Sequence, residues 1–384
     1  MEKEYLMIPG PTPIPHEITQ AMGSDIFNHR GPKFKDLIED VTEKLKKVFS
    51  TSNDLFVLTT SGTGAMETGV VNFISPGDKV ISLSNGSFGD RLANIARTYN
   101  ADVENIHSEW GDPLDYEALE KKLDEDKDGE IKAILVVHNE SSTGMMNDIE
   151  RVSKLRTNHP ALMIVDTVSS LGAVPVEVDE WNIDVCLTGS QKALLLPPGL
   201  AFISVNERAW EVMQNCTQPV FYFSLQKAKD FLDVGQTPFT PAIPQVVALK
   251  ESLEMILEKG RQYAFDRHYL MMQAVRKAAE GLGLELLVKE EAYASRTVTA
   301  IKKPQDIEIK DLRSLMRNKY GVEIAGGQGK LSQEIFRIGH LGAITDMDVL
   351  TTIAALEMSL VELGSKVQLG SGVSKAQEVV MQKK

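Results

Sequence analysis

Hydrophobic and polar positions follow two alternating periods between about residues 37 and 205. The first helical pattern carries one apolar stripe with a period near 3.6, formed by Leu37, Ile38, Val41, Leu45 and Val48. Short runs, most of them continuously apolar, separate such patterns, and we expect strands at residues 55–60, 79–84, 102–108, 131–137, 161–166, 185–189 and 200–205. Because strands without polar alternation are buried on both faces, the pattern predicts an α/β fold with a mostly parallel sheet covered by helices.

The pattern changes beyond Pro244. A long helical pattern runs from about 244 to 280, with an interruption at Gly260, and it precedes two further strands and two further helices. These elements predict a smaller C-terminal α+β domain that is joined to the large one through a long helix. We therefore expect an N-terminal arm over residues 1–15, a large domain over 16–258, a small domain over 259–364 and a flexible, polar tail over 365–384.

Composition narrows the class of protein. The 384 residues are 42% hydrophobic and 25% charged, values typical of a soluble globular protein. A net charge of −13 argues against binding to nucleic acids or anionic membranes. The sequence has neither a long apolar run nor a secretory signal, so we expect a cytoplasmic protein. Its two cysteines and scattered histidines predict neither disulfides nor a metal site.

Polar residues follow several of the predicted strands, at the edge where open α/β sheets bind ligands. The turn Ser61-Gly62-Thr63-Gly64 leads into a helix, where free backbone N–H groups and the helix dipole suit an anion such as phosphate. In isolation such a turn is more often a simple chain reversal. Asp166 ends the strand 161–166, where it either caps a helix or holds a protonated ring nitrogen of a cofactor.

Two cations complete the set of candidate residues. Lys192, in TGSQKALLLPPG, follows a buried strand and precedes an apolar run, so its amine is poorly placed to reach solvent. Burial lowers the pKa of an amine and favours Schiff-base chemistry. Arg337, in IFRIGHLG, lies inside an apolar strand, where it either forms a structural ion pair or binds a substrate carboxylate. Together with Asp166, 26 residues (192 − 166) before the lysine, these groups favour chemistry over separate structural roles.

The sequence resembles the class V aminotransferases of pyridoxal-phosphate (PLP) fold type I, in particular the alanine–glyoxylate / serine–pyruvate (serine–glyoxylate) aminotransferase group. The matching segments occur in family order and span nearly the whole chain before the tail. They are PGPTPIP (9–15), SGTGAMET (61–68), SNGSFGDR (84–91), HNESSTG (138–144), IVDTVSSLG (164–172), TGSQKALLLPPGLAF (188–202), TPFTPAIP (237–244) and FRIGHLG (336–342). The TGSQKALxxPPG and VDxVSSLG patterns are the specific ones.

The resemblance implies a PLP cofactor and a role for each matching residue. Lys192 corresponds to the Schiff-base lysine and catalytic acid–base, and Asp166 to the partner of the pyridine nitrogen. The other implied cofactor contacts are Gly62, Thr63 and Gln191 at the phosphate, Ser142 near the ring hydroxyl, and Val168 and Phe88 on the two ring faces. Some relatives have a tryptophan at the position of Phe88, so the aromatic face is smaller here.

The resemblance also implies a homodimer with a site shared across the interface. Thr240, and with it Thr237, corresponds to residues that reach the phosphate of the neighbouring subunit. Arg337 corresponds to the residue that binds the substrate α-carboxylate, and Gly10 lines the substrate side. His29 and Arg30 stay open between binding a distal anionic group and tying the N-terminal segment to the core.

The expected reaction is a ping-pong transfer of an amino group from alanine or serine to glyoxylate or pyruvate. The alternatives are a lyase reaction on the same fold or transamination of an acidic or phosphonate substrate. A cysteine desulfurase is disfavoured, because Cys186 lies in a predicted strand and Cys216 lacks a Gly/Ser-rich mobile loop. A binding protein without activity is disfavoured too, because both Lys192 and Asp166 are present.

Overall fold

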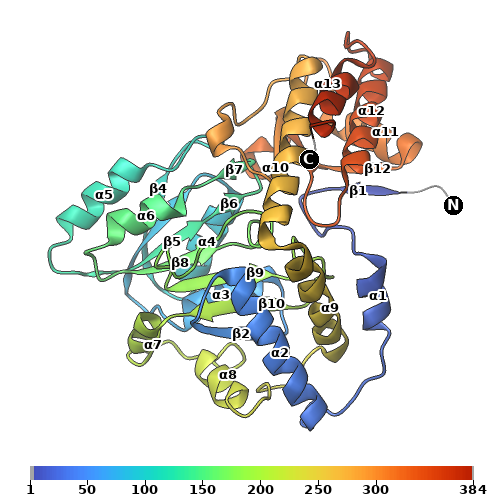
Figure 1. Ribbon diagram of the computed structural model, residues 1–384. Coiled ribbons are helices and arrows are strands. Elements are labelled where there is room, and N and C mark those ends of the chain that lie inside the picture. The colour runs from blue at the N-terminus through green and yellow to red at the C-terminus, as the bar shows by residue number, and fades with distance from the viewer. Residues whose placement is uncertain (1–3, 383–384) are drawn as a thin grey trace.

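The computed structural model describes residues 4–382 and contains two main sheets (Figure 1). The strands of the large sheet are β2 (Asp54–Leu58), β3 (Lys79–Ser84), β4 (Asp102–His107), β5 (Ile131–Val137), β8 (Leu162–Asp166), β9 (Val185–Gly189) and β10 (Ala201–Val205). Their spatial order is β2-β10-β9-β8-β5-β3-β4; β10 runs antiparallel to both of its neighbours, β2 and β9, and the other pairs are parallel. The predicted mostly parallel α/β sheet, with all seven of its strands, is confirmed.

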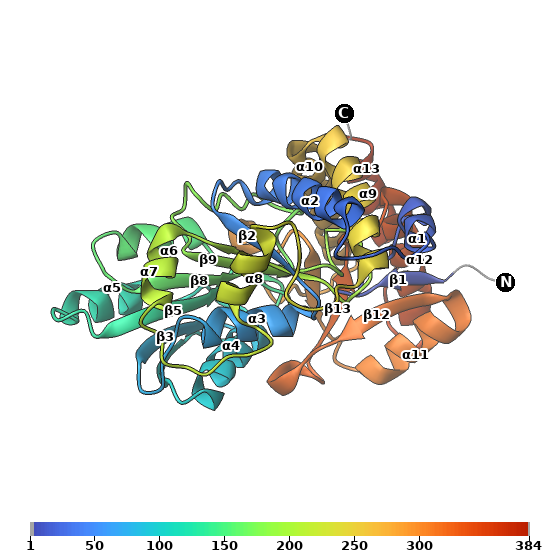
Figure 2. The same cartoon turned by 90° about the horizontal axis from the view of Figure 1, so that it is seen from below.

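Helices cover both faces of this sheet (Figure 2). They are α2 (Pro32–Phe49), α3 (Gly62–Val71), α4 (Ser87–Thr98), α5 (Tyr116–Glu125), α6 (Ile149–Arg156), α7 (Glu207–Met213), α8 (Leu225–Leu232) and α9 (Ile243–Lys259). Alternate residues of each strand point to opposite faces. In β5, Ile134 and Val136 belong to the core that contains α2, α5, α6 and α9, whereas Ala133 and Leu135 belong to the core with α3 and α4. Burial on both faces explains why the sequence of β5 is apolar throughout.

The second sheet has four strands in the order β1-β12-β13-β11. These strands are β1 (Tyr5–Met7), β11 (Val298–Lys302), β12 (Val322–Gly326) and β13 (Ile335–Gly339), and the helices around them are α10 (Arg261–Gly281), α11 (Ile309–Tyr320), α12 (Asp346–Glu362) and α13 (Ser371–Val380). Strand β1 pairs in parallel with β12, and its Met7 side chain is buried in the core of this sheet. The segment expected to be an N-terminal arm therefore supplies an edge strand to the C-terminal part of the chain.

Short elements complete the fold. These are α1 (His16–Met22), the two-stranded β6 (Asn139–Glu140) and β7 (Met145–Met146), and two 3₁₀ turns, η1 (Glu291–Tyr293) and η2 (Gly329–Leu331). Helices α9 and α10 run on from one sheet to the other, separated only by Gly260, as the sequence predicts. No helix within residues 4–382 is long and apolar enough to cross a membrane.

The segment expected to be a flexible tail, 365–384, contains α13, ten residues that pack against α10 and α12, so the expectation is wrong for this helix. Residues 383–384 of the expected tail lie outside the described residues. The start of α13 is fixed by Glu357, a buried residue of α12 whose carboxylate accepts hydrogen bonds from backbone N–H groups of Gly370, Gly372 and Val373 at 2.6–2.8 Å. A polar, Gly/Ser-containing composition does not disclose such a long-range cap.

Candidate active site

Two of the predicted residues, Asp166 and Lys192, lie at the carboxyl ends of neighbouring strands of the large sheet. Asp166 is the last residue of β8 and pairs in register with Leu187 of the parallel strand β9. Lys192 follows three residues after Gly189, the last residue of β9. Because the carboxyl ends of adjacent parallel strands meet, the carboxylate and the amine share one buried environment.

The Lys192 amine lies under the N-terminal segment. Its Nζ donates a hydrogen bond to the carbonyl oxygen of Pro9, and Thr12 Oγ1 donates to the Lys192 carbonyl at 3.2 Å. A Cβ atom on Gly10, whose φ is +136°, would lie 2.5 Å from Nζ, so only glycine fits at this close approach. Burial lowers the pKa of Lys192 to about 8, although the negative charge of Asp166 acts to raise it.

Asp166 is a buried carboxylate with one direct hydrogen bond from the chain. Its Oδ1 accepts from the backbone N–H of Val168 at 2.7 Å. Burial, together with the nearby charge of Glu140, raises the pKa of Asp166 to about 7, although the Val168 hydrogen bond and the charge of Lys192 oppose this shift. A carboxylate in this setting gains from any cation placed beside it.

The Ser61–Gly64 turn forms the amino end of α3, as predicted. Ser61 caps the helix by accepting from Gly64 N at 3.3 Å. The turn lies directly against the lysine loop, since a Cβ atom on Gly189 would be 3.2 Å from Gly62 Cα, and one on Gly62 would be 3.1 Å from Val168. These close approaches bring Gly62, Gly189, Val168 and Gln191 together at the amino end of α3. The first N–H groups of a helix are suited to binding an anion.

Gln191 and Thr63 complete this turn. The side-chain oxygen of Gln191 is buried and has no hydrogen-bond partner among residues 4–382, which is unusual for a buried amide. Thr63 is exposed, and its hydroxyl accepts from Arg91 of α4 at 3.4 Å. The Arg91 guanidinium in turn lies 4.7 Å from the centre of the Phe88 ring. Arg91 is thus a cation of this site that the sequence reasoning missed.

Glu140 is the second residue that the sequence reasoning missed. It lies in β6, is fully buried, and accepts hydrogen bonds from the backbone of Phe88 and from the Ser142 hydroxyl. Burial raises its pKa, and the hydrogen bonds oppose that shift. The only signal in the sequence was a carboxylate within HNESSTG, directly after an apolar strand.

Arg337 enters from the second sheet. It lies in β13 and is 5% exposed; its Nε donates to Gly326 O at 2.9 Å and its Nη1 to Ser141 O at 2.8 Å. Burial lowers the pKa of Arg337 to about 10, although the charge of Glu140 acts in the opposite direction. Within residues 4–382 its hydrogen bonds go to backbone carbonyls and not to a carboxylate, so the ion-pair explanation does not describe this arginine.

The loop that carries Thr237 and Thr240 makes other contacts. Thr237 Oγ1 donates to Phe239 O at 2.8 Å, and Thr240 is exposed. Arg30 holds this loop by donating to Gln236 Oε1 at 2.8 Å and to Thr237 O at 2.7 Å. These bonds favour the tying role for Arg30 over binding of a distal anion.

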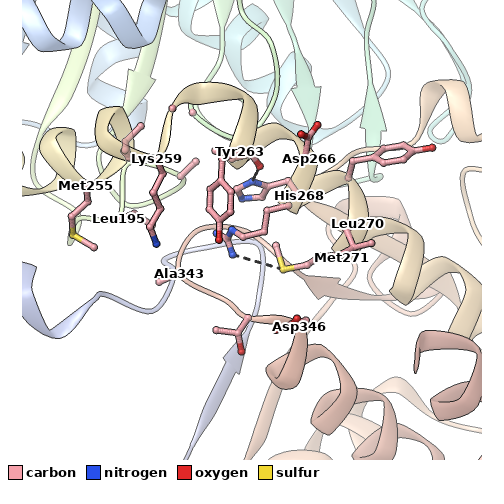
Figure 3. A pocket seen from close by; sticks show the side chains of 18 of the residues that line it. Leu195, Met255, Lys259, Tyr263, Asp266, His268, Leu270, Met271, Ala343 and Asp346 are labelled. Atoms are coloured by element: carbon pink, nitrogen blue, oxygen red, sulfur yellow. Dashed lines mark hydrogen bonds between the residues drawn. The ribbon is translucent and has the colours of Figure 1, made fainter. Parts of the chain in front are cut away.

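A cavity of about 720 Å³ lies where α9 meets α10 (Figure 3). Lys259, Tyr263 and Met271 line it, together with Leu195, which follows Lys192 by three residues. Neither Lys192 nor Asp166 lines this cavity, so it is separate from the candidate active site.

Comparison with known proteins agrees with this geometry. The sequence profile described as Aminotransferase class-V matches residues 4–338. An uncharacterized aminotransferase of Methanocaldococcus jannaschii is 45% identical, over 99% of this chain and 98% of that protein. A protein of Synechococcus sp. named soluble hydrogenase, small subunit, is 42% identical over 99% of both chains. The solved structure of an alanine–glyoxylate aminotransferase from Nostoc sp. is 30% identical, covers 94% of this chain and 96% of its own, and has a TM-score of 0.89.

Proposed function

The chain belongs to the aminotransferase class-V family, and from this premise we propose that it is a PLP-dependent aminotransferase for small substrates. It moves an amino group from alanine or serine to glyoxylate or pyruvate by a ping-pong mechanism. The observation that carries the proposal is the buried pair of Lys192 and Asp166 at the ends of adjacent strands, with the pKa of Lys192 lowered to about 8. Glyoxylate is also the acceptor in the name of the Nostoc sp. protein.

The residues around Lys192 fit PLP. The Gln191 amide, whose oxygen is unpartnered among residues 4–382, is free to turn toward a phosphate at the amino end of α3. The proposed contacts are Gly62, Thr63 and Gln191 at the phosphate, Asp166 at the pyridine nitrogen, Phe88 and Val168 on the ring faces, and Ser142 near the ring hydroxyl. When bound, PLP withdraws electrons from the substrate Cα and so makes its proton acidic.

Lys192 anchors the cofactor and then carries the proton. With a pKa of about 8, its amine is partly neutral near neutral pH and accepts a proton more readily than an exposed lysine does. Its Nζ already lies between the Pro9 carbonyl and Gly10, which shield it from water. Asp166 contributes a poorly solvated negative charge, which favours a protonated nitrogen beside it.

Arg337 binds the α-carboxylate of the substrate. Among the described residues its Nε and Nη1 are engaged by backbone carbonyls, which fixes the plane of the guanidinium and leaves Nη2 for a ligand. Gly10 lines the same side, and its missing side chain keeps the space beside Nζ open for a small substrate.

The active unit is a homodimer in which Thr237 and Thr240 reach the phosphate of the neighbouring subunit. Support for this comes from exposed aromatic residues beside their loop. Tyr222 stacks on Phe239 with ring centres 5.1 Å apart, and Phe221 lies 5.8 Å from Phe239 while being 70% exposed. Exposed, clustered aromatic rings are typical of protein interfaces.

Transamination of an acidic substrate is the second candidate, and Arg91 is the observation that favours it. Its guanidinium reaches Thr63 and lies over Phe88, so a second cation is available beside the proposed cofactor site. An Arg91→Gln variant that loses activity with acidic donors but keeps it with alanine would support this candidate.

The proposed function is tested with purified protein loaded with PLP. Addition of alanine or serine converts the absorbance of the bound cofactor to that of its amino form, and glyoxylate or pyruvate restores it. A matrix of donors and acceptors, including aspartate and an aminophosphonate, then ranks the substrates. No conversion with any amino donor would refute the proposal, and hydrogen evolution would favour the activity named for the Synechococcus sp. relative instead.

Replacement of the lysine gives the control for this experiment. We expect Lys192→Ala to lower turnover at least about 10³-fold, because it removes both the anchor and the proton carrier. Borohydride links the cofactor covalently to the wild-type protein, and mass spectrometry then finds the label on Lys192. A Lys192→Ala protein that still takes up label at wild-type yield would contradict the assignment.

A further inference from the structure

The Glu140 carboxylate replaces a missing cap at the amino end of α4. Gly86, the residue before this helix, has no side chain to accept its first N–H groups. Instead Glu140 Oε2 accepts from Phe88 N at 2.9 Å and from Gly89 N at 3.0 Å. A Cβ atom on Gly86 would overlap the Glu140 side chain, so the glycine makes room for the carboxylate. A negative charge at a helix amino end also interacts favourably with the helix dipole.

The other carboxylate oxygen orders Ser142. Glu140 Oε1 accepts from Ser142 N at 3.1 Å and from Ser142 Oγ at 2.5 Å. Ser142 Oγ in turn accepts from Ser87 N at 2.9 Å, so a chain of hydrogen bonds runs from Ser87 through Ser142 to Glu140. The hydroxyl proton of Ser142 is therefore committed to Glu140, and Ser142 offers a ligand only an acceptor lone pair.

Charged groups on two other elements face this carboxylate. Asp166 of β8 and Arg337 of β13 both interact electrostatically with Glu140, and Arg337 Nη1 donates to the carbonyl of Ser141, the residue between Glu140 and Ser142. The fully buried side chain of Glu140 thus lies beside three residues with proposed roles in the site, Phe88, Ser142 and Arg337.

We propose that Glu140 is a positioning residue, which holds the Phe88 ring and the Ser142 hydroxyl in place for the cofactor and makes Ser142 a pure acceptor. This role rests on the proposed function, since it concerns the same PLP site. It differs from a simple helix cap in its consequence, because loss of the carboxylate would change cofactor binding and not only folding stability.

The structure offers a matched control in Glu357. This residue is also a buried glutamate that accepts hydrogen bonds at the start of a helix, α13, but its donors are Gly370, Gly372 and Val373, which are not among the candidate site residues. In both Glu140→Gln and Glu357→Gln, an amide NH2 group replaces one carboxylate oxygen that accepts backbone hydrogen bonds. Each variant is compared with the wild type at full length, with and without added PLP.

For Glu140→Gln we expect at least a tenfold weaker Kd for PLP and an altered circular dichroism of the bound cofactor. Without PLP, amide hydrogen exchange of residues 87–89 becomes at least tenfold faster. For Glu357→Gln we expect the wild-type Kd for PLP, the wild-type cofactor dichroism and the wild-type exchange rate of residues 87–89. Faster exchange should be confined to residues 370–373. If Glu140→Gln fails to fold, Ser142→Ala is used instead, because it keeps the Glu140 carboxylate. We expect Ser142→Ala to change the dichroism of the bound cofactor.

Wild-type Kd and dichroism in Glu140→Gln, or in Ser142→Ala where only that variant folds, would overturn the proposal. Unchanged exchange at residues 87–89 would also overturn it, whatever the cofactor does. If the wild-type protein binds no PLP, the proposed function fails, while the exchange data still decide whether Glu140 orders the start of α4.

Discussion

Single buried polar residues set the chemistry of this site. Asp166 and Lys192 lie within a few residues of strands that are otherwise apolar, and burial shifts the pKa of each toward neutrality, to about 7 and about 8. Two groups with opposite charges and similar pKa values can exchange protons near neutral pH with little cost. Glu140 adds a second buried acid, which accepts hydrogen bonds from the backbone N–H groups of Phe88 and Gly89.

The raised pKa of Asp166 predicts how stability depends on pH in the protein without cofactor. Between the ordinary pKa of 3.8 and about 7, the folded state binds more protons at Asp166 than the unfolded state does. Its contribution to stability is therefore fully present below pH 3.8 and is lost as the pH rises through 7. We expect Asp166→Asn to weaken this decline, so that at pH 7.5 the variant is more stable than the wild type by about 1 kcal/mol or more.

Urea unfolding at pH 5 and pH 7.5 measures this difference. The same substitution is expected to lower turnover of the PLP-loaded protein about 10²-fold or more, because the ring nitrogen would lose the anionic partner that we propose for it. Equal pH dependence of stability in both proteins would show that Asp166 does not titrate in this range.

At the scale of elements, the two ends of each strand have different tasks. Strand β9 ends near Lys192, and directly before its first residue lies Asp184, which is 1% exposed. Asp184 accepts from Arg156 at 2.8 Å, from Arg208 at 2.8 Å and from the backbone N–H of Met163 at 2.7 Å. The carboxyl end of the strand therefore carries candidate chemistry, and the amino end carries a structural ion network.

This difference predicts that Asp184→Ala affects stability and not substrate binding. Removing the acid leaves Arg156 buried without its counter-charge, so we expect a loss of about 3–5 kcal/mol in the free energy of unfolding. KM for the folded fraction should stay within about twofold of the wild type. Asp179→Ala, which removes an exposed acid that caps the Thr51–Asn53 turn, is the control and should cost about 1 kcal/mol.

At the scale of the whole molecule, the site is assembled from parts that are distant in the chain. The N-terminal segment begins in the second sheet as β1, crosses Lys192 at Pro9 and Gly10, and continues into α1, which packs against α9. Arg337 crosses in the same way, from β13 to the backbone of Ser141. Movement of the second sheet relative to the first would thus alter both the cover of the lysine and the position of the arginine.

The exposed aromatic cluster of Phe221, Tyr222 and Phe239 predicts the oligomeric state. We expect the wild-type protein to have the mass of two chains by light scattering at micromolar concentration. A carboxylate in the cluster would be desolvated on association, so Phe221→Asp should weaken dimerisation at least tenfold and weaken PLP binding with it. Met347→Asp changes another exposed apolar residue, which is outside this cluster, and should leave the mass unchanged. A wild-type protein with the mass of one chain would contradict the dimer.

The sequence by itself determined the elements of the large sheet and the residues at their ends. Continuous apolar runs and 3.6-residue periods depend on local burial, so they predicted the seven strands, the α9–α10 junction at Gly260, and the places of Asp166, Lys192 and the Ser61–Gly64 turn. Residue types at those ends were enough to suggest chemistry. The resemblance to class V aminotransferases, which the comparisons confirm, rested on the same motifs.

Only the tertiary structure decided how these residues are held. The Pro9 carbonyl on Lys192, the Glu140 carboxylate at α4 and the Glu357 cap of α13 are hydrogen bonds between segments with no periodic relation in the chain. The same is true of the Arg337 contact with Ser141, in which a backbone carbonyl holds the guanidinium that the sequence analysis placed inside an apolar strand. Such contacts depend on which surfaces pack together when the two sheets come into contact. The spacing of residues along the chain does not specify that packing.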